Sequence, residues 1–171
     1  MKKIVSAACT ACFAAALCLF AACAPAVDDT ALSGRMEFVL DDKAGTIVSI
    51  EADLSGFTTA DRAIDVLDSL VEGRKICYSG SNGLYGVMLT GVGVAETDAD
   101  GAQIERYILR EDATAGRYLY LYTSVDEDKN DSEGMTTVDY EGQILAESLY
   151  GVGSMRVEAG AVIYITYYTY A

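Results

Sequence analysis

The sequence predicts an α+β fold in which one helix packs on a mixed or antiparallel sheet. Two kinds of apolar spacing lead to this expectation. From Ala60 to Val71 the apolar residues recur every three or four positions, as in a helix, whereas the segments on either side are rich in β-branched and aromatic residues. Strands, one helix and further strands, in that order, are typical of a sheet with a helix on one face.

The first expected element is a β-hairpin. Alternation within residues 35–40 places Met36, Phe38 and Leu40 on one strand face, and β-branched residues resume in residues 46–52. The stretch between these two segments is polar and ends in a glycine, which is the composition of a turn. We therefore expect two antiparallel strands at the start of the domain.

The helix is expected next. Its apolar face consists of Ala60, Ala63, Ile64, Leu67, Leu70 and Val71. Thr58 and Asp61 have the spacing of a capping box, in which side-chain oxygens accept hydrogen bonds from the first amides of a helix. Gly73 suits the left-handed conformation that often ends a helix.

After Gly73 most of the sequence has strand character. The expected strands are residues 76–78, 84–92, 103–109, 117–125, 136–140 and 161–170, with turns at 81–83, 98–101, 114–116 and 158–160. With the hairpin and the helix, these strands make the predicted architecture β-grasp-like. Leu-Tyr-Gly-Val occurs twice, at 84–87 and 149–152, and so short a match is interpreted as coincidence.

Several of these segments together resemble a known family. Residues 61–70, 76–78, 85–86, 118–122 and 157–165 are similar to the transcobalamin-like carboxy-terminal domain family, and the resemblance covers most of the chain after the amino-terminal segment. Members are commonly exported bacterial domains, similar to the β-domain that covers one face of cobalamin in intrinsic factor and transcobalamin. The resemblance thus implies a binding domain for a corrinoid or another small ligand.

The amino-terminal segment resembles a bacterial lipoprotein signal peptide. Lys2 and Lys3 precede an apolar run that ends Leu-Phe-Ala-Ala directly before Cys23. The resemblance implies cleavage before Cys23 and a diacylglycerol on its sulfur, so that the protein is exported and anchored to the outer face of the bacterial cell membrane. An uncleaved transmembrane anchor is the alternative, because the run is nearly long enough to span a bilayer. Small residues before Cys23, and no basic cluster after it, favour cleavage.

Three parts of the chain are therefore expected. They are a signal peptide at 1–22, a tether at 23–33 and the α+β domain at 34–171. Cys77 is the only cysteine after Cys23, so a lipidated protein would contain no internal disulfide.

Charge and composition narrow the functions. The chain has 12 basic and 26 acidic residues, a net charge of −14, and so lacks the basic surface that nucleic acid requires. It has no histidine, which excludes Ser-His-Asp and Cys-His catalysis and imidazole metal ligands. An acidic stretch from Asp126 begins like an EF-hand loop, but Asp131 and Thr137 replace the required glycine and glutamate. We expect a protein that is not an enzyme, without cofactor or metal, in which this stretch is a solvated acidic loop.

Tyrosines are the remaining signal, with 12 in the chain. Tyr118, Tyr120 and Tyr122 should share one strand face, with Leu119 and Leu121 on the other. If the leucines pack beneath the helix, the tyrosines face outward, where their rings could contact a flat ligand or a protein. A tyrosine ladder that only stabilises the sheet is the alternative. We predict a ligand-binding domain, or alternatively a structural or adhesion module that binds other envelope proteins.

Overall fold

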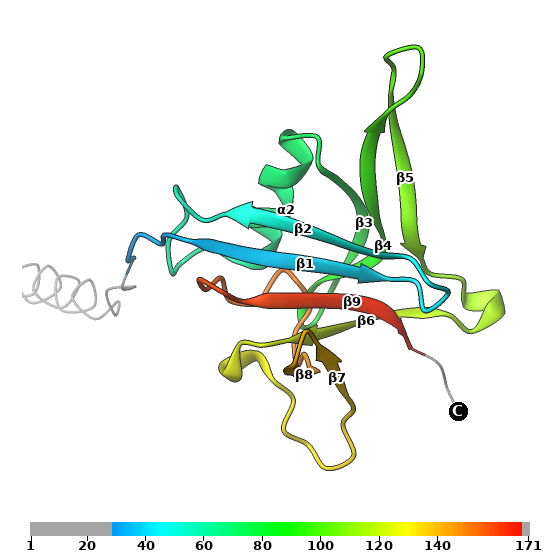
Figure 1. Ribbon diagram of the computed structural model, residues 1–171. Coiled ribbons are helices and arrows are strands. Elements are labelled where there is room, and N and C mark those ends of the chain that lie inside the picture. Colours follow the sequence, from blue (N-terminus) through cyan, green and yellow to red (C-terminus); the bar gives the residue numbers. More distant parts are fainter. Residues whose placement is uncertain (1–28, 169–171) are drawn as a thin grey trace, which may run out of the picture.

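The computed structural model describes residues 29–168, which form two β-sheets and one α-helix (Figure 1). The larger sheet has six strands in the order β2-β1-β9-β6-β8-β7, and the smaller sheet has the order β3-β4-β5. The strands of the larger sheet are β1 (Arg35–Asp41), β2 (Ile47–Asp53), β6 (Tyr118–Thr123), β7 (Thr137–Tyr140), β8 (Gln143–Glu147) and β9 (Val162–Tyr168). The smaller sheet consists of β3 (Ile76–Gly83), β4 (Gly86–Thr97) and β5 (Gln103–Arg110).

The predicted fold class, α+β and β-grasp-like with one helix on a single sheet, is wrong. The described residues are mostly β, because β3, β4 and β5 pair with one another and form a sheet of their own. Short connections favour this local pairing, and the central strand β9 already has β1 and β6 as neighbours. The larger sheet is therefore covered by both the helix and the smaller sheet.

The amino-terminal hairpin is confirmed. Strands β1 and β2 are antiparallel, with Arg35 opposite Asp53 and Asp41 opposite Ile47. Strand β9 lies parallel to β1 on its other side, and β6 is antiparallel to β9, so the larger sheet is mixed. This arrangement places β9, the last described strand, at the centre of the sheet beside β1.

The predicted helix is confirmed as α2 (Ala63–Glu72), with Ala63, Val66, Leu67 and Leu70 as its buried residues. The predicted apolar face is wrong at Ala60, which is exposed and precedes the helix, and at Val71, which is 40% exposed.

The expected capping box of Thr58 and Asp61 is wrong, because the helix begins at Ala63 and the N-cap amide, that of Arg62, donates to Asp65 Oδ2 at 2.7 Å. Thr58 and Asp61 contact each other just before the helix. Asp61 Oδ2 accepts hydrogen bonds from the amide and the hydroxyl of Thr58, at 2.7 and 2.9 Å.

The expected left-handed stop at Gly73 is wrong. Gly73 has φ −72°, a right-handed conformation, and the next residue, Arg74, has the positive φ of 54°. The amide of Gly73 still donates to the carbonyl of Ser69, so the helical pattern continues through the glycine. The chain turns one residue later than the glycine rule predicts.

The main hydrophobic core lies between the larger sheet and a layer made of α2 and the smaller sheet. Phe38 and Ile163 enter it from the larger sheet, Leu67 from α2, and Val92 and Leu109 from the smaller sheet, and each of these side chains is fully buried. In Figure 1 both α2 and the smaller sheet lie behind β1 and β2. Burial of each such side chain stabilises the fold by about 1.5–3 kcal/mol.

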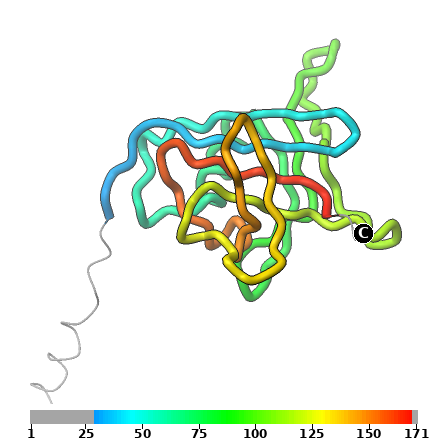
Figure 2. Tube along the Cα trace, turned by 60° about the horizontal axis from the view of Figure 1, so that its bottom comes forward, coloured from blue at the N-terminus to red at the C-terminus, as the bar shows by residue number. Residues whose placement is uncertain are grey.

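A second, smaller core occupies the opposite face of the larger sheet. Figure 2 shows the β7–β8 hairpin, in orange, crossing over β1 and β9. The buried residues of this core are Val39, Tyr122, Leu145, Val162 and Tyr164. The hairpin is also held at its tip, where the Tyr140 hydroxyl donates to the Glu37 carboxylate at 2.9 Å. Both faces of the central strands are therefore covered.

The expected signal peptide at 1–22 and Cys23 lie outside the described residues. Residues 29–33, the described part of the expected tether, form backbone hydrogen bonds with the domain. The amide of Leu32 donates to the carbonyl of Phe57 at 2.8 Å, and the amide of Thr59 donates to the carbonyl of Thr30 at 2.9 Å. Within residues 29–168, no helix has the length and apolar character needed to cross a bilayer.

A candidate ligand-binding cleft beside β6

The three tyrosines of the predicted binding row do not share one environment. Tyr118 is 41% exposed, Tyr120 is partly buried and Tyr122 is only 6% exposed. Tyr122 is buried because the β7–β8 hairpin covers this face of the sheet, which the alternation within β6 does not indicate. Tyr120 stacks on Tyr168 with ring centroids 4.5 Å apart. The three tyrosines therefore do not form one continuous outward row.

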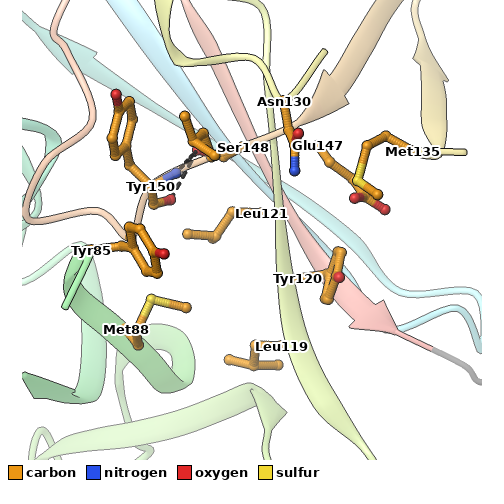
Figure 3. Close-up of a pocket in the computed structure, with 12 residues that line it drawn as sticks. Tyr85, Met88, Leu119, Tyr120, Leu121, Asn130, Met135, Glu147, Ser148 and Tyr150 are labelled. Carbon is orange, nitrogen blue, oxygen red and sulfur yellow. Dashed lines mark hydrogen bonds between the residues drawn. The ribbon is translucent and has the colours of Figure 1, made fainter. Parts of the chain in front are cut away.

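A cleft of about 300 Å³ lies beside β6 (Figure 3). It can form there because β6 pairs with β8 only at Tyr122 and Thr123, so no strand covers the rest of this edge. Of the predicted row, the cleft is lined by Tyr120 alone. Leu119 and Leu121 line it from the other side of the strand, the side predicted for them, and both are buried in the main core.

The apolar wall of the cleft comes from the β3–β4 hairpin. Its two-residue turn is Leu84 and Tyr85, which are 98% and 60% exposed, and Met88 follows at 41%. Tyr85 and Met88 line the cleft. Large apolar side chains gathered at the surface are typical of binding surfaces.

Glycines allow this hairpin to lie directly against the segment that follows β8. The amide of Gly151 donates to the carbonyl of Tyr85 at 2.9 Å. A Cβ atom on Gly151 would lie 2.4 Å from the carbonyl oxygen of Val87, and one on Gly86 would lie 2.7 Å from Ser154 Oγ. Gly86 also has φ +97°, which other residues rarely adopt. Only glycine fits at these two positions without a shift of the neighbouring chain.

These contacts bring the two copies of Leu-Tyr-Gly-Val together. Tyr85 and Gly151 belong to different copies, and residues of both copies line the cleft. Because the match was interpreted as coincidence, this contact was not predicted.

The polar wall contains a buried carboxylate, Glu147, which is 4% exposed. Its Oε1 accepts hydrogen bonds from the hydroxyl of Thr136 at 2.6 Å and from the amide of Thr136 at 3.3 Å. The Thr136 hydroxyl also lies 2.8 Å from the hydroxyl of Tyr122. Glu147 was not predicted as a site residue, because β8 was not among the expected strands.

A second buried carboxylate holds the acidic stretch that begins at Asp126 in place. Asp128 is fully buried, and its oxygens accept hydrogen bonds from the Arg156 guanidinium and the Arg156 amide, each at 2.6 Å. The carbonyl of Asp128 accepts from the amide of Leu149 at 2.9 Å. This part of the acidic stretch is therefore a buried structural contact, not the solvated loop that we expected. Across residues 29–168, no group of three or more acidic, cysteine or histidine side chains is placed to hold a metal ion.

No protein-family model and no curated protein matches this chain. The resemblance to the transcobalamin-like family therefore stays a prediction. The geometry of the cleft is therefore the structural basis for a ligand site.

Proposed function

We propose that this protein is a non-catalytic, lipid-anchored binding domain at the outer face of the bacterial cell membrane, and that the cleft beside β6 holds a small ligand. One observation carries the ligand site: an open cleft of about 300 Å³ with aromatic, leucine and methionine walls and a few polar groups. Sites for small molecules have this composition, and their volumes begin at roughly 300 Å³.

The anchor is proposed from the sequence alone. Cys23 follows an apolar run with small residues at its end, as in lipoprotein signal peptides. We expect mass spectrometry of the native protein to find an acylated Cys23 as the first residue. Cys23→Ser should abolish lipid labelling and release the protein from membranes. Any other mature amino terminus would contradict the anchor and leave the cleft proposal standing.

A corrinoid is the first ligand to test, because the family resemblance suggests it. A cleft of this size and openness would contact one side of a corrin ring and would not enclose it. Affinity should therefore be weak unless a second protein covers the other side. Calorimetric titration of the full chain in lipid nanodiscs with cobalamin, and with cobinamide, which lacks the lower base, measures this affinity. Similar binding of both compounds would indicate contact with the ring itself.

Two tyrosine variants distinguish the cleft from the predicted row. Tyr120 lines the cleft, whereas Tyr118 belongs to the same strand face and does not line it. We expect Tyr120→Ala to abolish binding and Tyr118→Ala to leave it nearly unchanged. Equal losses in both variants would favour the row over the cleft. If neither corrinoid binds at millimolar concentration, a corrinoid ligand is excluded.

A protein partner is the second candidate, and the exposed rim of the cleft favours it. Leu84, Tyr85 and Leu149 are 98%, 60% and 45% exposed. Gathered apolar side chains at a surface are typical of protein interfaces. A photo-crosslinking residue at position 84 should then capture an envelope protein, whereas the same residue at the exposed position 47 of β2 should not. Equal capture at both positions would contradict an interface at this rim.

A further inference from the structure

The buried acid in the cleft has no basic partner. Only Oε1 of Glu147 is used in the hydrogen bonds from Thr136. Oε2 accepts no hydrogen bond from the described residues, yet it is not sealed from solvent. Within residues 29–168, none of the ion pairs includes Glu147, and neither lysine nor arginine lines the cleft. Acidic side chains buried to this degree are usually paired with a cation.

The surroundings of this carboxylate suit a cation with an apolar body. Figure 3 shows Glu147, Tyr120 and Met135 on one side of β6. A tyrosine ring attracts a cation through its face, and a thioether makes favourable contacts with apolar and aromatic groups. On the other side of the strand, Leu119 and Met88 extend the apolar lining.

We infer that the cleft binds ligands in which a protonated amine or guanidinium is joined to an aromatic or apolar body. The inference rests on the proposed function of the cleft as a ligand site and names the chemical class of its ligand. The cation donates a hydrogen bond to Glu147 Oε2, and the body lies against Tyr120 and the apolar lining. The net charge of −14 also favours a cationic ligand, because it attracts cations and repels anions over a longer range.

Three matched probes test the charge preference on the full chain in nanodiscs of zwitterionic lipid. They are 2-phenylethylammonium, the neutral 2-phenylethanol and the anionic 3-phenylpropionate, titrated by NMR. We expect the ammonium to bind about tenfold or more tightly than the alcohol, as hydrogen bonds to a charged group allow, and the anion to bind most weakly.

Glu147→Gln should remove the preference while the alcohol binds as before, because a glutamine oxygen can still accept from Thr136. Glu72→Gln, an equal charge change at an exposed helical position, should preserve the preference. Thermal melts show whether each variant is folded. If a variant does not fold, the comparison of the three probes on the wild-type protein still tests the charge preference.

The outcomes separate this inference from the proposed function. Equal binding of the ammonium and the alcohol at the cleft would overturn the inference and keep the ligand site. A preference that survives in folded Glu147→Gln would also overturn it. If none of the three probes shifts cleft resonances, the inference fails, and the corrinoid titrations still decide the proposed ligand site.

Discussion

The two faces of the six-stranded sheet are covered by different chemistry. On one face, α2 and the smaller sheet bury leucine, isoleucine, valine and phenylalanine side chains. On the other face, the β7–β8 hairpin buries tyrosines whose hydroxyls donate to carboxylates, as in the pairs Tyr164–Asp41 and Tyr140–Glu37. Apolar burial does not depend on pH, whereas hydroxyl–carboxylate contacts do. The described residues of the other side contain one such contact, between Tyr78 of β3 and Asp68 of α2. The difference indicates that pH acts more strongly on the hairpin face.

The largest expected effect is on the apolar face. Leu67→Ala should lower the free energy of unfolding by about 2–5 kcal/mol, because it leaves a cavity between α2 and the sheets. Ser69→Ala, an exposed change on the same helix, should have an effect within about 0.5 kcal/mol. Denaturant melts of both variants measure the difference. Small effects in both would mean that α2 does not cover this core.

On the hairpin face, Tyr164→Phe should cost less, about 1.5–3 kcal/mol, because it removes one hydrogen bond to a charged group and preserves the ring. Tyr164 and Asp41 are both buried. Tyr164→Phe should lower the free energy of unfolding less in the Asp41→Asn variant than in the wild-type protein, because both substitutions affect the same contact. A double-mutant cycle by denaturant melts measures this coupling. Additive effects would contradict the contact.

Alkaline pH should weaken the hairpin face. Burial and the hydrogen bond to Glu37 raise the pKa of Tyr140 to about 12. Burial and the hydrogen bond to Asp41 raise the pKa of Tyr164 as well. An unfolded tyrosine ionises near pH 10, so the stability that these residues contribute is complete below pH 10 and is lost as pH rises from about 10 to 12. Tyr140→Phe should therefore reduce the alkaline loss in melts at a series of pH values, whereas Leu67→Ala should not.

Acid pH should have the smallest effect of this set. Burial alone would raise the pKa of Asp41, but hydrogen bonds from Tyr164 and Lys43 outweigh it and hold the pKa below its ordinary value of 3.8. This contribution to stability is present above about pH 4 and is lost as pH falls below that value. Asp41→Asn should flatten the dependence in this window, measured by melts from pH 6 to pH 2. An unchanged slope would contradict the lowered pKa.

The parts of the fold that the sequence predicts are the local ones. The alternation of Met36, Phe38 and Leu40 and the spacing of Ala63, Leu67 and Leu70 each depend on neighbours within one element, and the hairpin and helix follow. The division into two sheets depends on which strands pair across long stretches of chain. No spacing within a strand contains that information.

The same limit applies to the candidate site. Tyr120 was predicted because it alternates with leucines in β6, and it lines the cleft. Tyr122 has the same alternation, yet the β7–β8 hairpin buries it. Glu147 and Tyr85 come from segments far from β6 in the sequence, so only the tertiary fold brings them to the cleft that Tyr120 lines.

The pairing of Thr30 and Leu32 with the loop before α2 has a mechanical consequence. If Cys23 is held in a membrane, tension on the anchor reaches the domain at Phe57 and Thr59 before it reaches β1. Release of these few hydrogen bonds would add roughly 10 Å of reach, at about 3.3 Å for each freed residue, without opening a strand. The segment would then act as a short extensible link that absorbs movement of the envelope while the cleft keeps its shape.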